Sequence, residues 1–220
     1  MPFLFLQNAV IYYMILTIIK ERAISNECAI TRDRNWTAYL TEIYAKRPGT
    51  PIPYLKWQTN TYLPWFPVQT IEETQSFLQH YQEEYQQTLG HQYAVCFKKY
   101  NLPIGYVHLS YNDSYDLGYG LRHDFWRMGI TTEACLAIIE QLRKIGFSYI
   151  TATHDRNNPR SGEVMKKIGM TYRYSYEEQW QPKDKLVVFR MYQLNFDGQN
   201  SRVYQKYWNQ SKQHFIESFL

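Results

Sequence analysis

The stretch that decides the fold reads Tyr115-Asp-Leu-Gly-Tyr-Gly-Leu-Arg-His-Asp-Phe-Trp-Arg-Met-Gly-Ile-Thr-Thr-Glu-Ala134. The part up to Leu121 predicts a β-strand, and a helical pattern begins at Thr132. Between them lies a short connection that contains Gly129. At such a junction the unpaired N–H groups of the first helical turn and the helix dipole favour an anion such as a phosphate. A plain tight turn would also need this glycine, so the stretch alone leaves both interpretations open.

The chain after this stretch predicts alternating strands and helices. The helix expected over 132–145 carries its apolar residues at helical spacing. A second helix is predicted from Asn158, a good N-cap, to Gly169, a good terminator. We expect the tail to pack a last helix on the surface. The remaining strands are predicted at 147–153, 172–180 and 185–194.

The chain before this stretch predicts helices first and then a meander of strands. A helix over 70–87 begins with Thr70 and Glu73, which form a capping box. The proline-rich segment 47–67 cannot hold regular structure and is expected to be a functional loop. The other elements are a helix at 35–44 and strands at 12–22, 93–98, 104–109 and 115–121. This order predicts an α+β fold, with a mixed, mostly antiparallel twisted sheet and helices on both faces.

Composition places the chain among ordinary globular proteins. A chain of 220 residues with 45% apolar residues is one large domain that needs no disulfide or metal to fold. A net charge of +4 is too small for a dedicated nucleic-acid binder but suits an acidic ligand. Cys28, Cys96 and Cys135 have neither zinc-site nor disulfide spacing. The sequence therefore predicts a reduced, cytoplasmic protein without a metal site.

The N-terminus is the one feature that does not fit this description. Residues 3–19 are mostly apolar, and their length is at the lower edge of what a membrane span requires. A membrane anchor, a buried element and an extension upstream of Met14 are all open, and we favour the extension over the anchor. The expected organisation is an apolar extension at 1–13, one domain at 14–194 and a helical tail at 195–220.

A second motif, Asn158-Pro-Arg-Ser161, opens the helix that ends in Lys167-Ile-Gly-Met170. Together with Phe125-Trp-Arg-Met-Gly-Ile-Thr-Thr-Glu-Ala134, it resembles the GNAT superfamily of acyl-CoA-dependent N-acetyltransferases. The resemblance is strongest to the branch of the ribosomal-protein N-terminal acetyltransferases, where the loop usually reads aromatic-Trp-Gly-Lys-Gly-Tyr-Ala-Thr-Glu-Ala. The order of predicted elements agrees with that family from about residue 12 to residue 194.

The resemblance implies a site for acetyl-CoA, the acetyl donor. The loop would wrap the pyrophosphate with its backbone N–H groups, and the end of the preceding strand would pair with the pantetheine arm as an added strand does. A bulge in that strand would open the slot for the thioester. Arg127 departs from the family pattern and could contact a phosphate directly. The implied cofactor-binding residues are Gly120, Leu121, Arg122, Trp126, Arg127, Met128, Gly129, Ile130, Thr131, Thr132, Asn158 and Ser161.

The implied chemistry is direct attack of a neutral amine on the thioester, with a backbone N–H near Leu121 stabilising the oxyanion. Many relatives protonate the departing thiolate with a helix tyrosine, which corresponds to Met165 here. In the branch that this chain resembles, the serine of Asn-x-x-Ser is the candidate acid, which implies Ser161, and related enzymes place a carboxylate base on the next strand, which implies Glu178. Ser161 could equally be a polar residue bonded within the first helical turn, and Glu178 a solvated surface charge.

Two functions stay open at this point. One is an N-acetyltransferase acting on a protein N-terminus or a small amine, with an acceptor pocket formed by the loops at 47–67 and 179–185. The other is a non-catalytic CoA-binding sensor or interaction module on the same fold. Neither needs nucleic acid or a membrane as a partner, and a homodimer is compatible with both.

Overall fold

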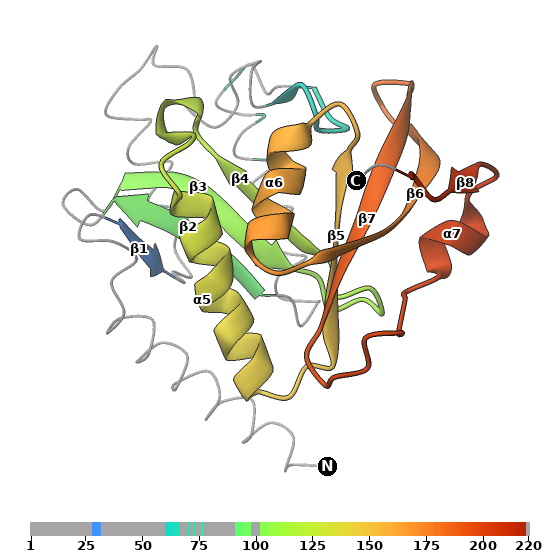
Figure 1. Ribbon diagram of the computed structural model, residues 1–220. Helices are drawn as coiled ribbons and strands as arrows, with labels where there is room; N and C mark the ends of the chain where they lie inside the picture. The colour runs from blue at the N-terminus through green and yellow to red at the C-terminus, as the bar shows by residue number, and fades with distance from the viewer. Residues whose placement is uncertain are drawn as a thin grey trace, which may run out of the picture.

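The computed structural model describes residues 28–31, 60–66, 70, 73, 76, 91–97 and 102–218. Its strands form two four-stranded sheets, and helices α5 (Ile130–Lys144) and α6 (Pro159–Lys167) lie across the face turned to the viewer in Figure 1. The extension at 1–13, the strand expected at 12–22 and the helix expected at 35–44 lie outside the described residues.

The first sheet is an antiparallel meander in the order β1-β2-β3-β4. Its strands are β1 (Cys28–Thr31), β2 (His91–Phe97), β3 (Leu102–Leu109) and β4 (Leu117–Leu121). The sequence pattern predicted the last three but not β1, which is only four residues long. Before this sheet, the Glu73 N–H donates to Thr70 Oγ1 at 3.1 Å, as the capping box predicts.

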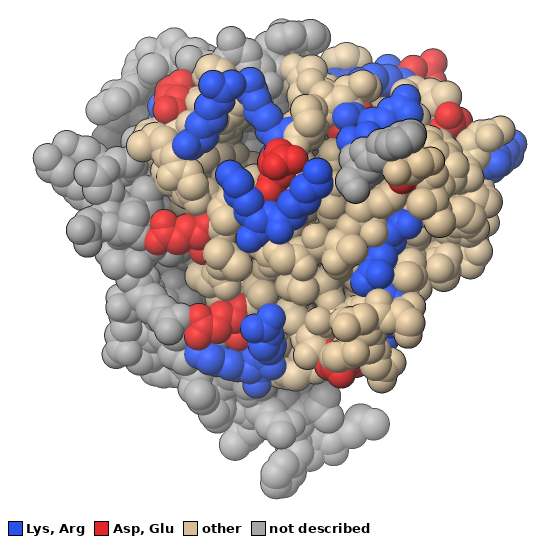
Figure 2. All heavy atoms as spheres, viewed as in Figure 1, with Lys and Arg blue, Asp and Glu red and all other residues tan. Residues whose placement is uncertain are grey.

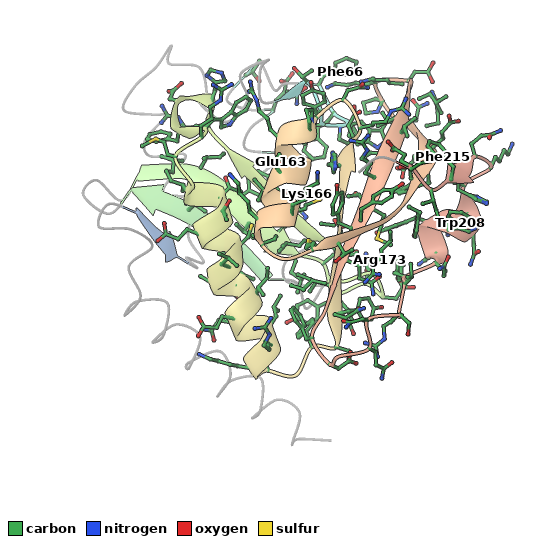
Figure 3. The ribbon with its side chains drawn as sticks, in the orientation of Figure 1. Phe66, Glu163, Lys166, Arg173, Trp208 and Phe215 are labelled. Carbon is green, nitrogen blue, oxygen red and sulfur yellow. The ribbon has the colours of Figure 1, made fainter. Side chains whose placement is uncertain are left out.

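The second sheet has the order β5-β7-β6-β8, also antiparallel. Its strands are β5 (Tyr149–Asp155), β6 (Thr171–Trp180), β7 (Lys185–Asn195) and β8 (His214–Phe215). The expectation of a helical tail is only partly right, because the tail forms the five-residue helix α7 (Lys206–Gln210) and then adds β8 to β6. Figure 3 shows Trp208 and Phe215 at this edge. The tail buries aromatic rings against the sheet, as where Trp208 meets Tyr174 at 5.4 Å, and these contacts outweigh a longer helix.

The two faces of the second sheet carry different packing. In β7, Tyr192 belongs to the main core beneath α5 and α6, whereas Phe189 and Met191 belong to a smaller cluster that includes Tyr207 and Trp208. Because side chains alternate along a strand, these two clusters lie on opposite faces. The main core holds α5 and α6 through residues such as Ile138 and Met165, which are buried.

The α+β fold class with its mainly antiparallel strands is confirmed. Helices α5 and α6 cover one face, and the helices predicted for residues 35–44 and most of 70–87 fall outside the described part of the chain. None of the described helices has the length and apolar character that a membrane crossing requires. Residues 3–19, on which the question of a membrane anchor depends, lie outside the described residues.

Candidate functional site

Strands β4 and β5 are joined at one end only, and we call the unpaired stretch between their facing edges the slot. Strands β4 and β5 run parallel and touch at one end, where Asp116 bridges Thr151 and the Thr151 N–H donates to the Tyr115 carbonyl at 3.2 Å. Beyond this bridge the described residues of β4 pair only with β3, and those of β5 only with β7. The facing edges of β4 and β5 therefore lack a strand partner beyond the bridge, as a sheet edge does where a peptide-like ligand can add as a strand, although the Leu121 and Asp155 carbonyls already accept bonds from Trp126 Nε1 and the Asn158 N–H.

The hydrogen-bond register of β4 shows which backbone groups face the slot. The Arg122 N–H donates to the Ile104 carbonyl of β3 at 2.8 Å, so the groups of every second residue, Gly120 included, point toward β3. The backbone of Tyr119 and Leu121 then points toward β5. The predicted bulge is wrong, because the β3–β4 register is regular throughout. The slot opens through divergence of the two sheets after the Asp116–Thr151 bridge.

The loop after β4 is anchored by a hydrogen bond to the end of that strand and finishes in a left-handed turn at the start of α5. A short 3-10 helix, η2 (His123–Phe125), leads to Trp126, whose indole N–H donates to the Leu121 carbonyl at 2.8 Å. Arg127 and Gly129 follow in left-handed conformations with φ of 66° and 78°. Gly129 is the N-cap of α5, and its carbonyl accepts from the Glu133 N–H.

This backbone geometry fits a phosphate. The first N–H groups of α5 have no partner within the helix and converge just beyond Gly129, in the kind of concavity that binds anions. A Cβ added at Gly129 would meet no atom of the described residues within 4 Å other than those of its chain neighbours, so the space on that side of Gly129 is open in the described structure. The pyrophosphate site that the resemblance implied for residues Arg127 to Thr132 stays a prediction, and this open turn at a helix start is the local geometry on which it depends.

Helix α6 begins on the other side of the slot. Asn158 is its N-cap but makes no side-chain capping bond, contrary to its expected role as a cap, so its amide is not used there. The Arg160 guanidinium lies over the Trp126 ring at 5.2 Å and links α6 to the loop. Arg160 was not among the predicted site residues, although its place between Asn158 and Ser161 is a signal that could have suggested it. Figure 2 shows Lys and Arg side chains on this face interspersed with Asp and Glu, and Lys166 is paired with Glu163 at 3.3 Å.

Ser161 has a partner that sequence reasoning missed. Tyr119 crosses from β4 to the first turn of α6, where its hydroxyl donates to the Ser161 carbonyl at 2.8 Å. The Ser161 hydroxyl in turn donates to the Tyr119 oxygen at 3.1 Å. Burial raises the pKa of Tyr119, while the bond from Ser161 lowers it. No local motif signals this pair, because 42 residues separate its members.

Met165 is buried in the main core with only 1% of its surface exposed. It lies one turn after Ser161 in α6 and packs as an ordinary apolar residue. The position where the resemblance would place a catalytic tyrosine therefore contributes to stability and carries no proton donor.

The opposite face of the sheets carries two carboxyl groups with raised pKa values. Partial burial raises the pKa of Glu178, which interacts electrostatically with Tyr176. Burial raises the pKa of Asp116 to about 7, and its Oδ1 has no hydrogen-bond partner among the described residues. Asp116 also interacts electrostatically with Tyr176 and Tyr207. Sequence reasoning named Glu178 but not Asp116, because nothing local shows that this carboxyl is buried.

The glycines of β4 serve internal packing. A Cβ on Gly118 would overlap the His108 ring, and one on Gly120 would lie 2.5 Å from Tyr106 Cε1. The rings of Tyr106 and His108 are stacked with their centroids 5.9 Å apart. Gly120, predicted to touch the cofactor, thus makes room for a neighbouring aromatic ring and turns its backbone away from the slot.

The two loops expected to form the acceptor pocket are joined by one lysine. Lys183, in the turn between β6 and β7, donates to the carbonyls of Asn60 and Leu63, both at 2.7 Å, and to Asn60 Oδ1 at 2.9 Å. Asn60 is fully buried. Burial lowers the pKa of Lys183. The turn at 179–185 and residues 60–63 therefore form one connected wall.

Comparison with known proteins agrees with this geometry. A family model described as an acetyltransferase (GNAT) domain matches residues 52–171. RimL, a ribosomal-protein α-N-acetyltransferase solved in complex with coenzyme A, is 17% identical with a TM-score of 0.63, and the match covers 80% of this chain and 97% of that one. The microcin self-immunity acetyltransferase MccE, solved with acetyl-CoA and AMP, is 16% identical with a TM-score of 0.63, covering 78% and 94%.

A ribosomal-protein alanine acetyltransferase from Vibrio fischeri is similar as well, at 17% identity and a TM-score of 0.57, covering 78% of this chain and 94% of that one. A search of curated proteins found no significant match. The structural likenesses establish the shared fold, and the family model extends over more than half of the sequence. The chain belongs to the acetyltransferase (GNAT) domain family.

Proposed function

We propose that the protein is an acetyl-CoA-dependent N-acetyltransferase that acts on a primary amine, either a protein N-terminus or a small molecule. The observation that carries this proposal is the slot between β4 and β5, which has unpaired strand edges and leads directly to the open, left-handed turn at Gly129. This arrangement suits a ligand with an anionic end and an amide-bearing arm, which is the chemistry of CoA.

Each part of the donor has matching groups in the chain. The N–H groups between Arg127 and Thr132 would bind the pyrophosphate, with Arg127 and Arg160 supplying positive charge nearby. The unpaired backbone edge at Tyr119, together with the Leu121 N–H, would hold the pantetheine amides, whereas the Leu121 carbonyl is occupied by Trp126. CoA in the RimL structure and acetyl-CoA in the MccE structure support the same choice of ligand.

The residues around the slot supply the groups that acyl transfer needs. The N–H of Leu121 points into the slot and would stabilise negative charge on the thioester oxygen. Glu178 would accept the proton of the attacking amine. Its pKa is raised from the usual carboxyl value in the direction of neutral pH, where a general base works best. The hydroxyl pair of Tyr119 and Ser161 lies on the α6 side, where the thiolate would leave.

The acceptor would enter from the face that carries Glu178. The wall joined by Lys183 borders this face and would shape the pocket. A ribosomal-protein N-terminus as acceptor is supported by the names of RimL and the Vibrio fischeri relative. A small-molecule amine is the other option, since family members with this fold differ mainly in their loops.

A binding experiment tests the first half of the proposal. CoA and acetyl-CoA should raise the melting temperature of the full chain, because a ligand that binds only the folded state stabilises it by mass action. Millimolar CoA without any shift, together with no binding by calorimetry, would exclude a CoA site.

A turnover experiment tests the second half. Release of free thiol from acetyl-CoA should depend on an added amine, tested with a panel of N-terminal peptides and small amines. Glu178→Gln should lower the rate at neutral pH and recover as pH rises, because the fraction of free amine then grows. A loss that is the same at every pH would remove Glu178 from the mechanism. CoA binding without turnover of any amine would favour the sensor function instead.

A further inference from the structure

The two hydrogen bonds between Tyr119 and Ser161 assign a role to a strand residue. We propose that Tyr119 donates a proton to the CoA thiolate as it leaves, and that the Ser161 hydroxyl stabilises the phenolate left behind. This inference rests on the proposed acetyltransferase function and deepens it, because it moves the acid from helix α6 to strand β4.

The position of Tyr119 follows from the geometry of β4. Its backbone groups point toward β5, into the slot, because the alternate residues Gly120 and Arg122 bond to β3. Its side chain projects to the face of α6 and ends at Ser161, in the first turn of that helix. A thioester lying along this part of the slot would therefore pass directly beneath the phenol.

The acidity of the two hydroxyl groups distinguishes the acid from its partner. Both protons are engaged in this structure, that of Ser161 on the Tyr119 oxygen and that of Tyr119 on the Ser161 carbonyl, so the phenolic proton must turn from this carbonyl to reach the sulfur. Burial has the largest effect on the pKa of Tyr119 and raises it, and the hydrogen bond donated by Ser161 opposes that rise because it stabilises the phenolate. A phenol, with an ordinary pKa of about 10, is also much closer in acidity to a thiol than an aliphatic hydroxyl is. Burial raises the pKa of Tyr119, and it would raise that of a thiol in the same slot as well.

The proposed step balances in atoms and charge. The amine nitrogen forms a bond to the acetyl carbon, the carbon–sulfur bond breaks, and the amine loses a proton to Glu178 or water. The sulfur takes the phenolic proton of Tyr119 and leaves as CoA thiol. The phenolate accepts a hydrogen bond from Ser161 and regains its proton from solvent after the product departs.

The test compares Tyr119→Phe with Tyr192→Phe in the full chain. Tyr192 is a buried tyrosine on the α6 face of β7 that interacts electrostatically with Tyr119 but makes no hydrogen bond to Ser161 in the described structure, so it controls for loss of a buried hydroxyl beside the same site. Tyr119→Phe should lower kcat by about 100-fold, the usual contribution of one general acid. The KM for acetyl-CoA and the Kd for CoA should stay within about threefold, because only the transition state is affected.

Ser161→Ala should lower kcat by a smaller factor than Tyr119→Phe does. Adding Ser161→Ala to Tyr119→Phe should cause no further loss of kcat, because the Ser161 hydroxyl acts only through the Tyr119 phenol. The proposal is overturned if Tyr119→Phe keeps kcat within about threefold of the parent, or if Tyr192→Phe loses as much. It is also overturned if the two losses at Tyr119 and Ser161 multiply.

If Tyr119→Phe does not fold, 3-fluorotyrosine at position 119 keeps the shape of the ring and makes the phenol more acidic. The rate of acetyl transfer should then change, and an unchanged kcat and pH profile would overturn the proposal. A parent protein that binds CoA but acetylates no amine would refute the proposed function instead, so the two failures are distinct.

Discussion

Two groups of glycines lie within a dozen residues of each other and serve opposite purposes. In β4, Gly118 and Gly120 lack a Cβ because the rings of His108 and Tyr106 already fill that space. In the following loop, Gly129 has no atom of the described residues, other than those of its chain neighbours, within 4 Å of where its Cβ would be, and its φ is 78°. A glycine that is packed by its own protein serves the fold, whereas one that faces open space in a left-handed turn leaves room for a ligand.

This difference divides the predicted cofactor residues into two classes. Gly129 faces open space, the first N–H groups of α5 have no partner within the helix, and Leu121 turns its backbone to the slot. Gly120 and Arg122 direct their backbone groups to β3. Sequence similarity places all of them in one motif, and only their surroundings separate the open positions from the packed ones.

The largest expected effect tests whether water is excluded from the face of β4 that carries Asp116 and Gly118. Asp116 lies on the same face as Gly118, and burial raises the pKa of its carboxyl to about 7 from 3.8. A raised carboxyl pKa stabilises the fold at low pH, and this stability is lost as pH rises from about 4 to about 7. Asp116→Asn removes the charge and keeps the shape. Relative to the parent, it should gain on the order of 3 kcal/mol between pH 5 and pH 8.

Urea unfolding of both proteins at the two pH values measures this gain. Other titrating groups are present in both proteins and cancel in the difference. If the difference in free energy of unfolding between Asp116→Asn and the parent is the same at pH 5 and pH 8, water reaches the Asp116 carboxyl and this face of β4 does not exclude it.

The next effect tests the open space beside Gly129, in the loop before α5. Gly129→Asn should weaken CoA binding by about 100-fold, equivalent to about 2.7 kcal/mol, because the side chain would occupy the space needed by a phosphate. Asparagine tolerates a left-handed backbone, so the fold should change little. Gly146→Asn is the matched control, since Gly146 also has a positive φ and open surroundings but lies at the other end of α5. Equal CoA affinity of the two variants would contradict the phosphate site.

A smaller effect is expected from the packed glycines. Gly118→Ala should destabilise the fold by about 2 kcal/mol, because its Cβ would overlap the His108 ring. In a His108→Ala background the same change should cost much less, which a double-mutant cycle measures. The folded fraction should bind CoA with unchanged affinity. A marked loss of affinity without loss of stability would place Gly118 on the ligand side after all.

The smallest effect concerns Arg127, which holds a positive φ of 66° without being glycine. Arg127→Gly relieves this strain but adds freedom to the unfolded chain, so the free energy of unfolding should stay within about 0.5 kcal/mol. CoA binding should weaken by about threefold at low salt, and the difference should shrink at high salt, as for an exposed charge contact. A loss that is independent of salt would indicate that the loop conformation, and not the charge, has changed.

Several features of this protein could be predicted from the sequence because they depend on short-range patterns. The strand–loop–helix order around Gly129, the helix that starts at Pro159 and the hairpin of β6 and β7 all follow from periodicity, capping and turn residues. The two motifs at Phe125–Ala134 and Asn158–Ser161 were enough to predict the family. Backbone N–H groups at a helix start are fixed by local geometry, so the candidate phosphate loop could be predicted as well.

Other features required the tertiary structure, because they join residues that are distant in the chain. The opening of the slot depends on how β4 and β5 diverge after the bridge at Asp116 and Thr151, and no bulge marks it. The Tyr119–Ser161 pair spans 42 residues, and the Lys183–Asn60 link spans 123. Burial is likewise a property of the assembled core, so the raised pKa of Asp116 had no signal in its neighbours along the chain. Local sequence thus determined which elements form, and long-range packing decided which of their side chains meet.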